Sequence, residues 1–233
     1  MTYDQDIILN EMAKSAVLSK ANRNTISILG ENSRIMTYFP DETIVMEGDS
    51  PQELFLIIDG IVALGAHHHE RETILSLMER GSFLLLQAVI TKHVYLQSAK
   101  AITRATLLAI PATKFRAAIA SDPALAMATM SIIASDHRDS IRDLKNMKLR
   151  SSSERLANWI LENTQIDGHL ELKVNKQLLA DKLGMTSESL SRCLRLLQSF
   201  GITNKRHSLV VNDEPLLRKF ARPSTLIDKN GRY

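Results

Sequence analysis

The sequence predicts an α+β protein with an N-terminal antiparallel β-roll of the jelly-roll type, a long helix and a C-terminal winged helix-turn-helix. Three observations predict this fold. Short strand-like runs separated by glycines occupy much of residues 35–110. Residues 124–150 then contain neither Gly nor Pro, and residues 175–200 place two amphipathic helices on either side of a glycine.

The composition is that of a globular chain. It has 233 residues, of which 44% are apolar and 24% charged, so a disordered or fibrous protein is excluded. No stretch approaches the roughly eighteen consecutive apolar residues of a membrane span, and residues 1–14 are too charged for a secretory signal. A single cysteine, Cys193, allows no internal disulfide. We therefore expect a cytoplasmic protein with no membrane partner.

Charge is distributed unevenly along the chain. Residues 1–147 carry 14 basic and 17 acidic side chains, whereas residues 148–222 carry 13 basic and 8 acidic ones. A basic module behind a slightly acidic one favours phosphate binding by the C-terminal part. Ordinary scatter of surface charge is the alternative.

The N-terminal half begins with helices and continues with strands. Apolar residues recur at helical spacing within residues 1–34, with a second short run at 26–29. Strand-like runs follow at 43–46, 54–58, 61–64, 73–77 and 106–110. Asp59-Gly60 lies between two of these runs and predicts a hairpin there.

A long helix is predicted after the strands. Residues 112–120 form a short helix, and Asp122-Pro123 supplies the cap and the first position of a longer one that runs to about residue 150. Its narrow apolar seam is typical of a homodimer interface, although a helix packed along its own barrel is the alternative. The predicted dimer contacts are Met130, Ile133, His137, Ile141 and Leu144.

A new helix is predicted to follow a serine cap at Ser151 with Glu154 in its first turn, and to end near residue 163. The domain boundary is therefore expected near residue 149. The predicted domains are residues 1–121 (helices and β-roll), 122–149 (dimerisation helix) and 150–233 (winged helix-turn-helix).

Residues 175–200 carry the most specific pattern in the chain. Helices are predicted at 176–182 and 186–199, with Ala180 allowing close crossing and Gly184 taking the positive φ of the turn. The residues spaced to pack the two helices together are Leu179, Leu183, Met185, Leu190, Cys193 and Leu194. We interpret this as a helix-turn-helix rather than an ordinary helical hairpin. Cys193 then reads as a core thiol, with a reactive thiol as the alternative.

One face of the second helix is polar. Glu188, Ser191, Arg192 and Arg195 lie at positions i, i+3, i+4 and i+7. A carboxylate, a hydroxyl and a guanidinium suit base edges in a major groove, so base contacts are expected from Glu188, Ser191 and Arg192. A solvated face with a Glu188–Arg192 ion pair is the competing interpretation.

Strands around this pair predict the wing. Residues 170–174, 201–203 and 209–211 read as three strands, with a basic turn between the last two. Contacts to the DNA backbone are expected from Lys173, Lys176, Gln177, Thr186, Ser187, Arg195, Lys205 and Arg206.

At this point the sequence resembles the Crp/Fnr family of transcription regulators over nearly its whole length. The segments 39–49 and 54–64 are similar to the family's sensor domain, and residues 188–192 carry the E-x-x-S-R pattern of the Fnr/FixK/Dnr-like branch. The resemblance implies a homodimer that binds double-stranded DNA at a TTGAT-N4-ATCAA-like palindrome. It also implies an activator that contacts RNA polymerase, with the loop 165–169 as a candidate surface, and that controls a respiratory, oxygen- or nitrogen-oxide-related regulon.

Departures from the family pattern exclude two of the family's effectors. Leu85-Leu86 and Gln97-Ser98 stand where the family's nucleotide cassette has Gly-Glu and Arg-Ser, so cyclic AMP is not expected. One cysteine cannot hold an iron–sulfur cluster. Leu84, Leu85, Leu86 and Val89 are predicted to line an apolar effector pocket. Haem is one candidate ligand, and the alternative is that the protein has no effector. His93 and His137 are lone candidates for an axial haem ligand.

The competing class is an enzyme on a cupin-like metal-binding β-barrel that uses the run His67–His69. Three adjacent histidines on a strand cannot all point the same way, so we expect them at an exposed turn. No metal site and no catalytic residue are predicted.

Overall fold

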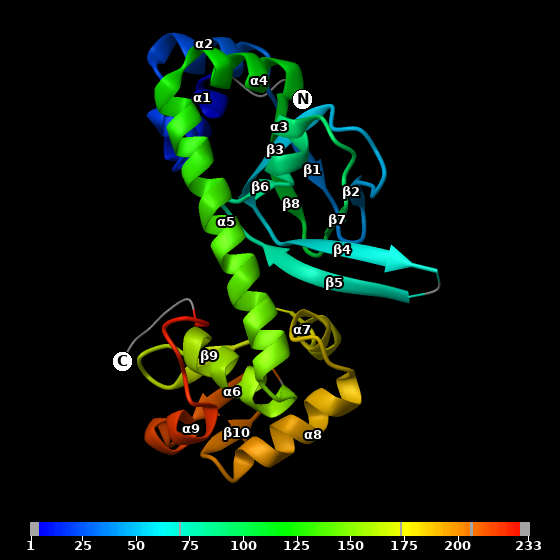
Figure 1. Cartoon of the computed structure of the whole chain (residues 1–233), viewed down its shortest axis with the longest axis vertical. Helices are drawn as coiled ribbons and strands as arrows, with labels where there is room; N and C mark the ends of the chain where they lie inside the picture. Colours follow the sequence, from blue (N-terminus) through cyan, green and yellow to red (C-terminus); the bar gives the residue numbers. More distant parts are fainter. Residues whose placement is uncertain (1–4, 70, 173, 206, 229–233) are drawn as a thin grey trace. The chain divides into compact units, whose positions relative to one another are not determined.

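The structure is a computed structural model that describes residues 5–69, 71–172, 174–205 and 207–228. The chain divides into two compact units, Met1–Ser135 and Asp136–Tyr233 (Figure 1). The division falls inside α5, Pro123–Leu149, a continuous helix of 27 residues.

Short helices gather at one end of the first unit, where Figure 1 places α1, α2 and α4. The helices are α1 Gln5–Lys14, the 3-10 turn η1 Leu18–Lys20, α2 Arg23–Glu31, α3 Leu86–Thr91 and α4 Ala112–Ser121. The helical N-terminal segment and the short helix before Asp122 are thus confirmed.

Two four-stranded antiparallel sheets make up the rest of the first unit. Their strand orders are β1-β8-β3-β6 and β2-β7-β4-β5. The strands are β1 Arg34–Tyr38, β2 Thr43–Val45, β3 Glu53–Asp59, β4 Val62–His68, β5 Arg71–Met78, β6 Phe83–Leu84, β7 Ser98–Ala101 and β8 Ala105–Pro111. This arrangement confirms the predicted jelly-roll-like β-roll.

The hairpin predicted at Asp59-Gly60 is wrong. β3 pairs with β8 and β6, whereas β4 pairs with β5 and β7, so the turn carries the chain from one sheet to the other. The turn is bound to a distant segment: the Thr103 hydroxyl accepts from Ile61 N–H at 2.9 Å, and the carbonyl of Ile61 accepts from Ile102 N–H at 2.8 Å. At Gly60 (φ 93°) a Cβ would lie 2.5 Å from the carbonyl oxygen of Arg104, so the close approach requires glycine.

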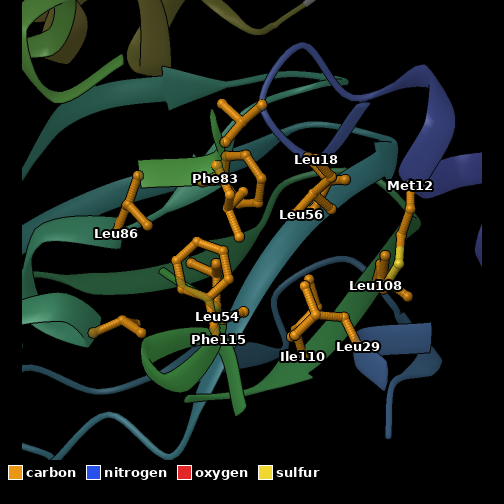
Figure 2. Packing of buried hydrophobic residues seen from close by; sticks show 14 of the residues in the cluster. Met12, Leu18, Leu29, Leu54, Leu56, Phe83, Leu86, Leu108, Ile110 and Phe115 are labelled. Carbon is orange, nitrogen blue, oxygen red and sulfur yellow. The ribbon is translucent and has the colours of Figure 1, made fainter. Parts of the chain in front are cut away.

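The central strands β3 and β8 of the first sheet are buried on both faces. Along β3, Leu54 and Leu56 pack in a cluster with the helices, while Phe55 and Ile57 pack in a second cluster with residues of the other sheet. This is the two-residue alternation of a strand whose faces are both covered. Figure 2 shows the first cluster, in which Phe115 of α4 meets Leu54 and its neighbours.

Asp122 fixes the start of α5. Its carboxylate accepts from Ala124 N–H at 3.1 Å and Leu125 N–H at 3.2 Å, as the predicted cap requires, and also from Asn22 N–H at 2.8 Å beside α2. These hydrogen bonds lower the pKa of Asp122, and the bond from Asn22 N–H has the largest effect. Burial acts in the opposite direction.

The second unit contains the rest of α5 and a winged helix-turn-helix. Its elements are α6 Ser152–Asn163, β9 His169–Glu171, α7 Lys176–Lys182, α8 Ser187–Gln198, β10 Ile202–Asn204, β11 Ser208–Val211 and α9 Glu214–Ala221. The strands form one antiparallel sheet in the order β10-β11-β9. Ser151 and Glu154 form a complete capping box at the start of α6, which confirms the predicted serine cap.

Among the described residues, no single helix has the length and apolar character to cross a bilayer. Only α4 and α5 taken together, across a 113° bend, reach that length and composition.

Candidate DNA-binding interface

The turn between α7 and α8 has the geometry that the sequence predicted. Asn175 caps α7 by accepting from Leu178 N–H at 2.9 Å, and Thr186 caps α8 by accepting from Ser189 N–H at 3.2 Å. Gly184 has φ 62°, a conformation that a side chain would strain. The carbonyl of Ala180 accepts from Met185 N–H at 3.0 Å, which closes the turn.

The two helices pack through the predicted positions. Ala180 is fully buried, and Leu179, Leu183, Leu190 and Leu194 lie with it in the core of the second unit, while Met185 packs against the edge of that core. Cys193 is buried in the same core, and its Sγ lies 3.3 Å from the Ser153 hydroxyl oxygen. Its surroundings are those of a core thiol.

The predicted reading face of α8 is exposed. Glu188, Ser191, Arg192 and Arg195 all present their side chains to solvent. Arg192 donates from Nη2 to Ser189 Oγ at 2.9 Å, and the Ser191 hydroxyl donates to the carbonyl of Ser187 at 2.9 Å. These bonds orient both side chains while leaving guanidinium donors and a hydroxyl acceptor free for a base edge.

Glu188 is held ionised by its position in the first turn of α8. Its own backbone N–H lowers the pKa of Glu188 most, followed by the Thr186 hydroxyl; burial opposes them, and the charge of Arg192 lowers the pKa least. An ionised carboxylate only accepts hydrogen bonds, as contact with a cytosine amino group requires.

The residues predicted to meet phosphates fall into three groups. Lys176, Thr186, Arg195 and Lys205 are exposed. Gln177 and Ser187 bond to each other, the Ser187 hydroxyl donating to Gln177 Oε1, and so link the two helices. Lys173 and Arg206 lie outside the described residues.

Arg155 was missed by the sequence analysis. It lies on α6 with 8% of its surface exposed and donates from Nε to the carbonyl of Leu183 at 2.9 Å and from Nη2 to that of Gly184 at 3.1 Å. It therefore holds the carbonyls of the helix-turn-helix turn. Burial lowers the pKa of Arg155. In the sequence, its only signal is a polar pair with Asn158 three residues on, which a solvated helix face would also show.

The predicted dimer residues follow α5. Met130 is 54% exposed, Ile141 46% and Leu144 58%, and His137 is exposed as well. Ile133 is half-buried against the core of the first unit. A row of exposed apolar side chains along one side of a helix is a candidate interaction surface. The homodimer stays a prediction.

The candidate effector residues lie in the core rather than around a described cavity. Leu86 and Val89 belong to the cluster with the helices, and Leu84 to the cluster between the sheets, with Leu85 packed against it. A ligand would have to displace these side chains, and the pocket stays a prediction.

The histidines considered as ligands are exposed. His67 and His68 end β4 and His69 has φ 54° in the turn that follows; the carboxylate of Glu47 lies 3.3 Å from His67 Nδ1. In the described part of the chain, no three His, Cys, Asp or Glu side chains are grouped to hold a metal ion. His93 and His137 also face solvent.

Two family models match the chain in succession and together cover about two thirds of it. Residues 35–122 match the cyclic nucleotide-binding domain, and residues 154–220 match the Crp-like helix-turn-helix domain. The chain belongs to the Crp/Fnr family. It is a DNA-binding transcription regulator of that type, and the match covers both the β-roll and the reading helix described above.

Solved structures share the fold of this regulator. A proposed cAMP-binding regulatory protein from Silicibacter pomeroyi DSS-3 is 25% identical, with a TM-score of 0.61 over 94% of this chain and 100% of that one. FixK2 from Bradyrhizobium japonicum is 18% identical, with a TM-score of 0.70 over 85% and 98%. CLP from Xanthomonas campestris, described as responsive to c-di-GMP, is 20% identical, with a TM-score of 0.69 over 82% and 99%. No curated protein matches the sequence.

The residues of this regulator do not fit the cyclic nucleotide that the first model's description implies. Leu85 has φ 49°, a left-handed conformation that favours glycine, the residue that the family carries there. Leu86, at the place of the family's glutamate, is 2% exposed and packs in the core. The hydroxyl of Ser98 accepts from Glu47 N–H at 2.9 Å. An anionic nucleotide would find no compensating charge on residues 82–91.

Proposed function

We propose that this regulator binds, as a homodimer, a palindrome of the type TTGAT-N4-ATCAA, with Glu188, Ser191 and Arg192 reading each half-site. The exposed face of α8 carries this proposal, because it joins an ionised carboxylate to an oriented guanidinium at the start of a helix that follows a helix-turn-helix turn. Two half-sites about one helical turn apart require two copies of α8, and the exposed apolar stripe of α5 is the surface available for pairing.

Phosphate contacts from Lys176, Thr186, Arg195 and Lys205 would set the position of the reading helix on the duplex. The E-x-x-S-R pattern supports a respiratory, oxygen- or nitrogen-oxide-related regulon. Activation would require RNA polymerase to contact a surface loop, for which residues 165–169 are the candidate. The domain division at residues 121 and 149 belongs to the same proposal, with the long helix as the dimerisation segment.

The test is a titration of the purified protein with a labelled TTGAT-N4-ATCAA duplex and with a duplex of the same composition in scrambled order. Specific readout predicts binding about 10³-fold or more tighter to the palindrome at physiological salt. Both affinities should fall with salt because phosphates are neutralised in both complexes. Equal affinity for the two duplexes would overturn the proposal.

A further inference from the structure

The C-terminal segment of the second unit folds back onto the junction between α5 and α6. Asp228, 7% exposed, receives both terminal nitrogens of Arg150, at 2.5 Å (Nη1 to Oδ1) and 2.8 Å (Nη2 to Oδ2). Ser224 N–H donates to the same carboxylate at 2.5 Å, and Lys145 Nζ donates to the carbonyl of Leu226 at 3.3 Å. Residues 224–228 are therefore fastened to α5 and to its end by side-chain bonds.

Arg150 occupies the junction itself, one residue after α5 and one before the cap of α6. Its side chain also reaches Asn146 Oδ1, one turn back along α5, at 3.2 Å. A bidentate arginine–carboxylate pair fixes the guanidinium in a plane as well as in position. Because the two side chains are 7% and 6% exposed, water screens this pair little.

A second arginine connects the junction to the helix-turn-helix. Arg155 donates from Nη1 to the carbonyl of Arg150 at 2.9 Å, and from its other nitrogens to the carbonyls of Leu183 and Gly184. Gly184 is close to α5 as well, because a Cβ there would lie 2.3 Å from the methyl carbon of Met147. The backbone of the junction and the backbone of the reading turn are therefore held by one buried guanidinium.

We propose that the C-terminal segment is a positioning strap for DNA readout, in which Asp228 fixes Arg150, and Arg155 carries the position of that junction to the turn that presents α8. Asp228, Arg150 and Arg155 are positioning residues, since none lies on the exposed face of α8. The inference rests on the proposed function for its effect on DNA, but the strap itself is a property of the second unit that can be measured without DNA.

The test uses three full-length variants. Asp228→Asn removes the charge and keeps the shape, Asp228→Glu keeps the charge, and Glu214→Gln removes the charge from an exposed pair with Arg218 on α9. Each is measured by amide hydrogen exchange and by affinity for the palindromic and scrambled duplexes.

Asp228→Asn should speed exchange at residues 149–155 and 183–186 while leaving the β-roll unchanged, because the loosened junction frees the turn. It should weaken palindrome binding by about 2- to 30-fold with a smaller effect on the scrambled duplex. Asp228→Glu should keep most of the wild-type protection from exchange and most of the wild-type affinity for the palindrome. Glu214→Gln should match the wild type in both.

The strap is overturned if Asp228→Asn speeds exchange only at residues 222–228, or if it loosens the whole second unit uniformly. It is also overturned if the turn loosens but palindrome binding, present in the wild type, does not change. If the wild type itself does not discriminate between the duplexes, the proposed function fails, while the exchange data still decide whether the junction and the turn are coupled.

Discussion

Arg192 is the residue from which the largest effect on sequence discrimination is expected. Its guanidinium is exposed and oriented by Ser189, so it can donate two parallel hydrogen bonds to a guanine. Arg192→Ala should cost about 1–3 kcal/mol on the palindrome and relax discrimination at one base pair of each half-site. Competition titrations with single-base variants of the duplex measure both quantities. If palindromic and scrambled duplexes lost affinity equally, Arg192 would be a phosphate contact.

Lys205 should behave in the opposite way. It lies exposed just after β10, and we expect it to contact the phosphate backbone. Lys205→Ala should lower affinity for all duplexes alike and reduce the slope of log K against log salt by about 1. Salt titrations on both duplexes check this, and a loss confined to the palindrome would contradict it.

At the scale of single residues, the sequence predicted the exposed side chains proposed to contact bases but not the buried residues that support them. Glu188, Ser191 and Arg192 were predictable because helical spacing places them opposite a leucine stripe. Arg155 and Asp228 were not, because their partners are backbone carbonyls and an arginine tens of residues away. A polar residue that is buried by tertiary contacts has the same local pattern as one in solvent.

Among the helices and strands, Asp122 is a side chain that joins two helices of the first unit, α5 and α2. Its charge caps α5 and binds the backbone before α2. Asp122→Asn should therefore lower the melting temperature by a few degrees at pH 7. Asn22 N–H donates to one carboxylate oxygen and Ala124 and Leu125 N–H donate to the other, whereas a carboxamide has only one acceptor oxygen and would turn its NH2 group toward the remaining donors.

The effect should depend on pH in a defined direction. The pKa of Asp122 is lower in the folded than in the unfolded chain, so its stabilisation is fully present above the unfolded value of about 3.9 and is lost as pH falls through the folded value. The difference in melting temperature between wild type and Asp122→Asn should accordingly shrink only below about pH 4. Thermal melts from pH 7 to pH 3 measure it, and a difference that grew on acidification would refute the assignment.

Elements with local signals were predicted well, and those defined by distant pairing were not. The bounds of α7 were predicted because the turn glycine and the apolar spacing before it mark the helix. β7, with the sequence Ser-Ala-Lys-Ala, has little strand propensity and is a strand because it pairs with β2 and β4. α3 lies in an apolar run that would fit a strand equally well.

For the whole molecule, the Asp59-Gly60 turn shows what a local rule leaves out. The dipeptide favours a tight hairpin, but the strands on either side belong to different sheets. Which strands pair is decided by burial of both faces of β3, and that depends on β8, about fifty residues later. Sequence order alone could not select this pairing.

For the whole molecule, the proposed palindrome binding requires the proposed homodimer, and Leu144 is the side chain with which to test that pairing. It is 58% exposed on α5, close to Ile141 in the same apolar stripe. A glutamate there would be buried unpaired, and repeated by symmetry, in any self-complementary contact along the stripe. Leu144→Glu should therefore give a monomer by analytical ultracentrifugation at micromolar concentration.

The same variant should bind a half-site about as well as the wild-type protomer does but lose the gain from joining two half-sites, which can reach about 10²- to 10⁴-fold. Ser135→Glu is the matched control, because nine residues at 3.6 per turn place position 135 about two and a half turns away, on the opposite side of the helix. It adds the same charge and should stay dimeric. A Leu144→Glu protein that remained dimeric with full palindrome affinity would place the dimer interface elsewhere than on this stripe.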